Sequence, residues 1–354
     1  MRFSFFTFVI LFLLAEATEL RAFTVISNAG RPAVWADRSV TYELYNIPNN
    51  FKDPIRDSFE AWRLITGVDL SFTEVNLGGP NGARQGRNFI RWVESGWSQL
   101  SFRPPSNALA VTLSSFNSVT GEINYADIYF NAQNFDWAIV ENEDDLSFID
   151  VQNIATHEVG HMLGLDHSSV SFFESDPDLY EATMFYASGR GETSRREPKV
   201  DDERGIRSLY PSSPTAAPTI ELVEQIELIG DYAVYRIRGE NFNELTSFVL
   251  STLDYSYYDV VARYRTIFSS TEAEVEFDLG GFDATEATIV AFNHPESLFN
   301  YSLNLTTGQA TANSVSPKSG GGCSASSHGG ADSKTFFFFA SALLALMMLR
   351  RKKA

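Results

Sequence analysis

Apolar and polar positions in the first part of the chain follow two different periods. The segment "SVTYELYNI" (39–47) alternates apolar and polar residues, which predicts a strand with one buried face. The segment "KDPIRDSFEAWRLITG" (52–67) instead places Ile55, Phe59 and Trp62 at i, i+4 and i+7, on one face of a helix. Both elements are therefore expected to bury one face against a common core.

The same patterns continue to residue 211 and predict both strands and helices. A helix is expected from Asp150 to Gly164, and a closing helix covers "DDERGIRSLYP" (201–211) up to its proline. Four further strands are expected, at 68–75, 88–93, 108–113 and 125–131. The fold class predicted for this part of the chain is α+β, with a mixed sheet.

A proline-rich stretch divides the chain in two. The segment "YPSSPTAAPT" (210–219) sets three prolines among small residues, so we place a linker at 212–218, after a first domain at 22–211. The part at 219–310 has no convincing helix. Its apolar and polar residues alternate at 232–239, 273–279, 287–293 and 301–307, which predicts a small all-β sandwich. Within it, "RIRGENFNE" (236–244) resembles a turn of the immunoglobulin-like IPT/TIG domains.

The N-terminal residues follow the plan of an export signal. The segment "MRFSFFTFVILFLLAEATEL" begins with the basic Arg2, continues with a short apolar run and then reaches Ala15, Glu16 and Ala17. This arrangement predicts a signal peptide at 1–17 that is removed after Ala17, so that the mature protein is exported. An N-terminal membrane anchor is the alternative, although the apolar run is short for a membrane span.

The C-terminal end combines three kinds of residue. A Gly/Ser-rich segment at 311–335 contains the single cysteine, Cys323, and precedes an apolar stretch and the cations Arg350, Arg351, Lys352 and Lys353. A helix over the apolar residues would cover about 21 Å, less than a bilayer core of about 30 Å. Residues 336–354, a hydrophobic helix with a basic end, resemble the C-terminal sorting tails of Gram-negative bacteria. A eukaryotic lipid-anchor signal and an ordinary membrane anchor are the alternatives.

Charge and cysteine content exclude some partners and bonds. The 354 residues carry a formal net charge of −18, which argues against nucleic acid as a partner, because phosphate binding needs clustered Lys and Arg. The single cysteine excludes an internal disulfide. The hydrophobic fraction of 44% is ordinary for a globular protein that buries a core.

Three of the five histidines stand close together in "ATHEVGHMLGLDHS" (155–168). On a helix His157 and His161 share a face, because they are four residues apart. Gly164 can take a positive φ, end the helix and let the chain bring His167 back toward the other two. Three imidazole nitrogens at about 2.0–2.1 Å leave the fourth position of a tetrahedral zinc ion open for water. The spacing therefore predicts one catalytic zinc ion.

Glu158 lies between two of these ligands. Because it follows His157 directly, it points to the side of the metal, where its carboxylate can take a proton from water. Zinc would polarise the water and a peptide carbonyl, and Glu158 would act as general base and then pass the proton to the leaving amine. A surface or core imidazole is the ordinary explanation of a lone histidine, but three histidines in register with Glu158 and Gly164 favour the metal site.

The segment "HEVGHMLGLDH" (157–167) matches the extended H-E-x-x-H-x-x-G-x-x-H signature of the metzincin metalloproteases, and Ser168 follows it as in matrixins. The resemblance to matrixins covers roughly residues 35–211 and includes three further segments, at 42–75, 108–131 and 200–211. It implies a metzincin-type zinc protease domain with a twisted five-stranded mixed sheet and long helices. The active-site helix would lie beneath this sheet.

The resemblance implies further site residues. In "EATMFYASG", Met184 would form the methionine turn beneath the zinc, and Asp202 would bond to that turn. Tyr186 would help to stabilise the oxyanion, as in astacins and serralysins. Ordinary explanations stay open, with Met184 in the core, Tyr186 in the cleft wall and Asp202 as a helix N-cap. The gap between His167 and Met184 is longer than is usual for matrixins and predicts an inserted loop at 168–183.

Other features depart from the animal matrixins and favour the bacterial type. Val111 and Tyr129 take the places of histidines that hold a second, structural zinc in matrixins, so we expect no second zinc. Vertebrate matrixins are kept latent by a propeptide cysteine, and no cysteine precedes the domain here, so we do not expect that mechanism. A β-sandwich follows the domain in place of haemopexin-like repeats. Calcium sites are common in the family. Carboxylate oxygens for calcium could come from the loop residues Asp127, Asp144, Asp145 and Asp176. Acidic loop residues, however, are more often simply solvated.

Together these observations predict an exported zinc-dependent endopeptidase. Its peptide or protein substrate would lie antiparallel to the edge strand that contains Ala108, Leu109, Ala110 and Val111. The C-terminal tail would attach the protein to the membrane or cell surface, in association with the outer membrane. Processing of the tail would instead release the protein. A surface adhesin with a non-catalytic metzincin fold and a protease that processes its own chain are the alternatives.

Overall fold

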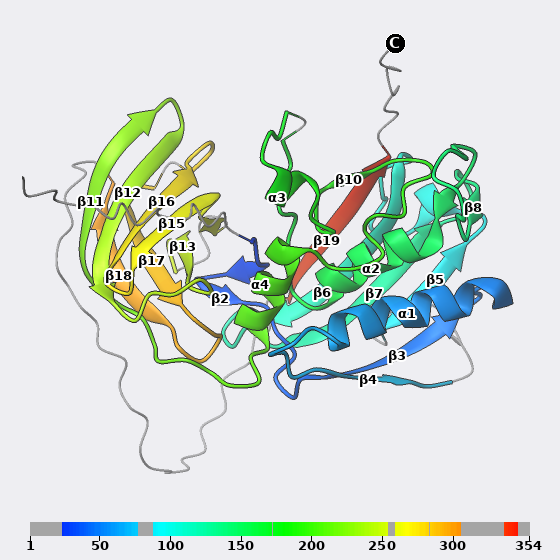
Figure 1. The fold of residues 1–354 in the computed structure, drawn as a ribbon, viewed down its shortest axis with the longest axis horizontal. Helices are drawn as coiled ribbons and strands as arrows, with labels where there is room; N and C mark the ends of the chain where they lie inside the picture. Colours follow the sequence, from blue (N-terminus) through cyan, green and yellow to red (C-terminus); the bar gives the residue numbers. More distant parts are fainter. Residues whose placement is uncertain are drawn as a thin grey trace, which may run out of the picture.

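The computed structural model describes residues 23–76, 88–171, 173–253, 259–282, 284–305 and 336–345. The signal peptide expected at 1–17, the segment with Cys323 and the basic end of the chain lie outside these residues. The described part forms two lobes (Figure 1). The first contains a large sheet with helices, and the second consists of strands alone.

The sheet of the first lobe is mixed, as the sequence predicts. Its five predicted strands lie side by side in the order β6-β7-β5-β3-β4. β6 runs antiparallel to β7, while the other neighbours are parallel. The bounds are β3 (Ser39–Tyr45), β4 (Ser71–Glu74), β5 (Phe89–Val93), β6 (Ala108–Asn117) and β7 (Ile123–Asn131). Each predicted strand is therefore confirmed, and β6 is longer than predicted.

Two helices pack together on one face of this sheet (Figure 1). In α1 (Lys52–Arg63) the predicted face is buried, since Ile55, Phe59 and Trp62 are at most 1% exposed. The indole nitrogen of Trp62 donates to the carbonyl oxygen of Thr156 in α2 (Val151–Met162), at 2.9 Å. This bond fixes the position of α2, the helix that carries two of the clustered histidines.

Shorter elements complete the first lobe, and the closing helix is α4 (Val200–Leu209). The others are β1 (Ser27–Asn28), β2 (Arg31–Pro32), η1 (Asn49–Phe51), η2 (Trp97–Gln99), β8 (Trp137–Ala138), β9 (Ile149–Asp150), α3 (Pro177–Tyr180) and β10 (Ala187–Ser188). α3 lies in the loop predicted at 168–183 and packs against α4.

The second lobe contains two four-stranded antiparallel sheets, β11-β12-β16-β15 and β14-β13-β17-β18. Tyr235, Phe248, Phe277 and Ile289 come from both sheets and are buried in one cluster. Four strands match predicted segments: β12 (Tyr232–Glu240), β16 (Glu272–Asp278), β17 (Glu286–Phe292) and β18 (Phe299–Asn304). The sequence reading missed four others: β11 (Thr219–Ile229), β13 (Ser247–Ser251), β14 (Val260–Val261) and β15 (Tyr264–Ser269).

The two lobes pack against each other through the first described residues of the chain. The backbone N–H of Gly30 donates to a carboxylate oxygen of Asp259 at 2.7 Å. The guanidinium carbon of the buried Arg265 lies 4.2 Å from the ring centroid of Phe23. Val249 and Val290 of the second lobe belong to the core cluster of the first. The lobes therefore share a buried contact in addition to the predicted linker.

The predicted C-terminal helix is a strand over the residues that the structure describes. β19 (Phe336–Ala345) runs antiparallel along β6 and parallel to β10, and extends the sheet to β10-β19-β6-β7-β5-β3-β4. A sheet edge offers unpaired N–H and C=O groups, and phenylalanine favours extended backbone, which explains the strand. β6 is consequently not an edge strand. In the described part of the chain, no helix has the length and apolarity needed to cross a membrane.

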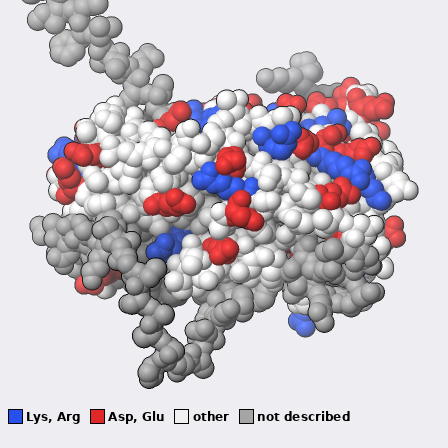
Figure 2. Space-filling view, turned by 90° about the horizontal axis from the view of Figure 1, so that it is seen from below, with Lys and Arg blue, Asp and Glu red and all other residues white. Residues whose placement is uncertain are grey.

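Charges of opposite sign lie close together on the surface. On the face in Figure 2, Lys and Arg side chains stand next to Asp and Glu side chains. Among the described residues, the guanidinium of Arg56 lies 2.7 Å from a carboxylate oxygen of Glu74, and that of Arg63 lies 2.5 Å from a carboxylate oxygen of Glu60.

Candidate metal centre

The two ends of α2 fix the position of the clustered histidines. At its start the side chain of Asp150 accepts from the backbone N–H of Asn153 at 2.8 Å, which confirms the predicted helix start. At its end Gly164 has φ +96°, and a Cβ there would overlap the carbonyl oxygen of Ala33. Glycine alone fits this turn without strain, and the turn carries the chain on to His167.

The three clustered histidines converge. Their ring centroids are 4.7 to 5.3 Å apart, and one nitrogen of each ring lies within 4.8 Å of the others. The Nε2 atoms of His161 and His167 are 3.2 Å apart. Two nitrogens at about 2.05 Å from one tetrahedral zinc ion would be separated by about 3.3 Å. The arrangement of His157, His161 and His167 therefore fits a zinc ion.

Hydrogen bonds and burial prepare the rings as ligands. The Nδ1 atoms of His157 and His161 lie 2.7 Å and 2.9 Å from the carbonyl oxygens of Thr183 and Leu165. Donation from Nδ1 to a carbonyl leaves Nε2 unprotonated and free to bind a metal. Burial lowers the pKa of all three histidines, so the rings are neutral. Nε2 of His157 is buried with no hydrogen-bond partner among the described residues.

Glu158 follows His157 directly in α2 and is fully buried. Its Oε2 accepts a hydrogen bond of 2.5 Å from the hydroxyl of Thr112, and its Oε1 is buried with no hydrogen-bond partner in the described part of the chain. Burial raises the pKa of Glu158 to about 8, and the bond from Thr112 acts against that rise. A carboxyl group with a pKa near neutrality suits general acid–base work.

A second layer of contacts supports His157 from below. The carboxylate of Asp202 accepts from the backbone N–H groups of Thr183 and Met184, at 2.7 Å and 3.0 Å. The carbonyl of Thr183 is the partner of His157 Nδ1. Met184 is buried against α2, where a Cβ on Gly160 would overlap its sulfur. Asp202 thus connects the closing helix to the turn that orients one histidine.

The remaining predicted residues lie at different distances from the rings. Tyr186 lies next to the centre, with its ring centroid 6.5 Å from that of His167. Residues 108–111 are buried in β6, between β7 and β19. Val111 and Tyr129 pack in a small apolar cluster.

The four aspartates named for calcium have separate positions. Asp127 is buried and accepts from the backbone N–H of Phe89 at 3.0 Å, and Asp176 caps α3. Asp144 and Asp145 are exposed in one loop. Among the described residues, the group of ligands that could hold a metal consists of the three histidines.

Sequence reasoning missed several residues that shape the centre. Thr112 is one, because a single threonine in an apolar strand carries no signal of its partner. Trp35 and Tyr210 are two others, which bind the end of α2. The indole nitrogen of Trp35 donates to the carbonyl of Met162 at 2.9 Å, and the hydroxyl of Tyr210 donates to that of Leu163 at 2.8 Å.

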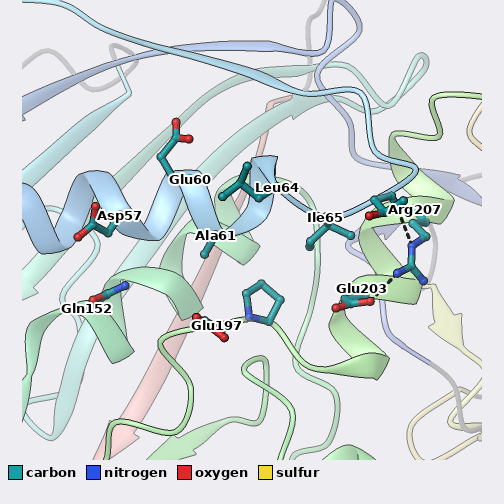
Figure 3. A pocket seen from close by; sticks show the side chains of 11 residues that line it. Asp57, Glu60, Ala61, Leu64, Ile65, Gln152, Glu197, Glu203 and Arg207 are labelled. Carbon is teal, nitrogen blue, oxygen red and sulfur yellow. Dashed lines mark hydrogen bonds and ion pairs between the residues drawn. The ribbon is translucent and has the colours of Figure 1, made fainter.

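A pocket of about 510 Å³ lies elsewhere, between α1 and the segment before α4 (Figure 3). It is lined by carboxylates, among them Asp57, Glu60 and Glu197, and by Arg207, which is paired with Glu203. It contains no histidine and no cysteine. The histidine cluster, in contrast, could hold a metal ion and includes a buried carboxyl group next to His157 in the chain, so it is the candidate site.

A mixed sheet with packed helices, one of which carries the His-Glu-x-x-His pattern, fits an α+β fold of the metzincin type. The family model described as matrixin matches residues 34–211, about half of the chain. The chain belongs to the matrixin family.

Three relatives illustrate how far the similarity reaches. Metalloendoproteinase 2-MMP of Arabidopsis thaliana is 31% identical over 109 residues, which cover 30% of this chain and 26% of that protein. Stromelysin-3 of Xenopus laevis is 29% identical over 209 residues, or 54% and 36% of the two chains. Matrix metalloproteinase-19 of Homo sapiens is 26% identical over 182 residues, or 50% and 30%. The chain spans about a quarter to a third of the length of these relatives.

Proposed function

We propose that the protein is a zinc-dependent endopeptidase. The observation that carries the proposal is the convergence of three neutral histidine rings, with one nitrogen of each within 4.8 Å of the others. The buried Glu158 follows one of these histidines directly in the chain. Histidine nitrogens suit zinc, and three of them leave a position open, as catalytic zinc sites require. Membership of the matrixin family supports the same conclusion.

The chain's own residues divide the work. His157, His161 and His167 hold the zinc ion, which when bound would supply Lewis-acid polarisation of a peptide carbonyl. Oε1 of Glu158 takes the proton from the attacking water and delivers it to the leaving amine. Tyr186 lies next to His167, and its hydroxyl donates a hydrogen bond to the carbonyl oxygen as negative charge develops there.

The substrate is an extended peptide that pairs with β6. Strand addition supplies affinity through backbone hydrogen bonds, and a neighbouring pocket supplies selectivity. Because β19 pairs with this side of β6, a substrate has to take the place of β19. The loop at 168–183 connects His167 to the turn at Met184, so it is suited to form a wall of the substrate pocket.

The proposal includes the destination of the protein. The pattern at 1–17 supports export through a signal peptide, and the order of residues at 311–354 supports a bacterial sorting tail that is retained at the cell surface or cleaved. The two antiparallel sheets of residues 219–305 support an immunoglobulin-like module, which would position the protease on a surface or partner.

Self-processing is a second candidate function with an observation in its favour. β19 lies antiparallel along β6, the arrangement proposed for a substrate. A chain that cuts its own tail would lose C-terminal mass at a rate independent of protein concentration, and Glu158→Ala would stay intact. Intact-mass measurements over time at two concentrations test this. An unchanged mass for the wild-type chain would remove this candidate.

The principal experiment compares the full chain with Glu158→Ala. Zinc content is measured by elemental analysis, and cleavage is measured on a library of fluorescence-quenched octapeptides. We expect one zinc per chain in both proteins and cleavage by the wild-type chain alone. Bound zinc without cleavage by either protein would favour the binding module, and equal cleavage by both would exclude Glu158 as the base.

A further inference from the structure

Thr112 is the one side chain that holds the carboxylate of Glu158 among the described residues. It lies on β6, is 1% exposed, and its hydroxyl oxygen is 2.5 Å from Oε2 and 3.1 Å from the backbone oxygen of Glu158. A hydroxyl has a single hydrogen, and the shorter contact to a carboxylate is the stronger bond. Thr112 therefore fixes one of the two carboxylate oxygens.

The strand geometry makes this contact specific to position 112. Side chains alternate along a strand, and Val111 and Leu113 pack with Trp97 in a small cluster on the opposite side. Ala110, on the same side as Thr112, belongs to the main core. A hydroxyl buried at such a position needs a polar partner, because burial without a hydrogen bond is costly.

Holding Oε2 changes what the other oxygen can do. A glutamate side chain rotates about three bonds, and much of that freedom is lost when one oxygen is fixed. Oε1, buried and without a hydrogen-bond partner among the described residues, is then the oxygen left for proton transfer. A base held in one geometry before the substrate arrives needs no rearrangement during the reaction.

We propose that Thr112 is a positioning residue that holds Glu158 with Oε1 ready to accept the proton of the attacking water. The inference rests on the proposed endopeptidase function. It deepens that function, because Thr112 lies on the strand that we propose binds the substrate backbone. One strand would then set the position of both the peptide bond and the base, and so the distance between them.

The test uses Thr112→Val, which keeps the shape and removes the hydroxyl, and Thr112→Ser, which keeps the hydroxyl. Thr246→Val is the matched control, since Thr246 is also buried and hydrogen-bonded but lies in the second lobe. The values of kcat and KM are measured on one octapeptide cleaved by the wild-type chain, together with zinc content. The melting temperature of each metal-free chain, measured for the single substitution and for its combination with Glu158→Ala, is the readout that does not depend on activity.

We expect Thr112→Val to lower kcat about 10- to 100-fold, the range for a misplaced catalytic group, with KM within about twofold and zinc content unchanged. Thr112→Ser should recover most of kcat, and Thr246→Val should keep it. The melting-temperature shifts of Thr112→Val and Glu158→Ala should be smaller together than their sum, because each substitution removes the same hydrogen bond.

Two results would overturn the inference. One is a Thr112→Val chain with wild-type kcat and additive melting shifts. The other is a Thr112→Ser chain as slow as Thr112→Val, which would indicate a packing role. If Glu158→Ala cleaves as fast as the wild-type chain, the proposed function itself fails. An inactive Glu158→Ala beside a fully active Thr112→Val would refute the role of Thr112 alone.

Discussion

The hydroxyl of Tyr210 ties the last turn of the active-site helix to the N-terminal segment. It donates to the carbonyl oxygen of Leu163 at 2.8 Å and accepts from the backbone N–H of Trp35 at 3.1 Å. The residue is fully buried, so water does not replace these bonds. Tyr210→Phe removes one oxygen atom, keeps the ring and leaves two backbone groups without their partner.

The cost of this change follows from those two groups. A buried donor or acceptor left without a partner costs about 1–3 kcal/mol, so the two groups together should lower the free energy of unfolding by about 2–6 kcal/mol. For a domain of this size, about 2–4 °C of melting temperature corresponds to each kcal/mol. The expected drop in melting temperature is therefore about 4–24 °C.

Thermal denaturation of the metal-free chain, followed by circular dichroism, measures the effect. Tyr45→Phe is the matched control, because the hydroxyl of the half-buried Tyr45 makes no hydrogen bond with the described residues. The control should melt within about 1 °C of the wild-type chain, the range for substitutions away from specific contacts. A Tyr210→Phe chain that melts with its control would refute the view that this hydroxyl holds the end of α2.

Three further predictions concern the same centre. Gly160→Ala should lower the melting temperature, because the added Cβ would overlap the Met184 sulfur and lie 2.9 Å from Trp62. The cost of overpacking, about 1–3 kcal/mol, outweighs the gain in helix propensity of about 1 kcal/mol. A rise in melting temperature would contradict this packing. Gly164→Ala should lower the free energy of unfolding in urea more than Gly189→Ala does. The reason is that Gly164 has φ +96°, whereas a Cβ on Gly189 meets nothing within 4 Å. Equal effects of the two substitutions would argue against a strained turn at Gly164. Removal of zinc by a chelator should lower the melting temperature. Zinc at about 100 times its Kd should restore about 2.7 kcal/mol to the free energy of unfolding. An unchanged melting curve would speak against a bound metal.

The elements that could be predicted have strong local signals. α1 shows a helical period with a broad apolar face, and α2 has an aspartate cap at its start and a glycine after its end. The spacing of His157, His161 and His167 is local too, because a helix and one turn bring them together without distant contacts. Local patterns therefore predicted the histidine cluster.

The errors occur where distant contacts decide the structure. A run of apolar residues at 336–345 shows no period that separates a helix from a strand, and pairing with β6 selects the strand. β11 was missed because several of its apolar positions, such as Leu228 and Ile229, are exposed, so its pattern is not that of a half-buried strand.

The side chains that support the site depend on register. The contact between Thr112 and Glu158 requires β6 to lie over α2 in one alignment, and a shift by one residue would turn Thr112 to the other face. Trp35 and Tyr210 reach the end of α2 from opposite ends of the first lobe's sequence. No short window of the sequence contains both partners of such a bond.

The measurement that tests the central claim most directly is a zinc titration of the metal-free chain, with octapeptide cleavage recorded at each point. The account predicts no cleavage without zinc, a rate that rises in proportion to added zinc, and saturation at one zinc per chain. Cleavage by the metal-free chain, or full zinc binding with no cleavage of any peptide, would contradict it.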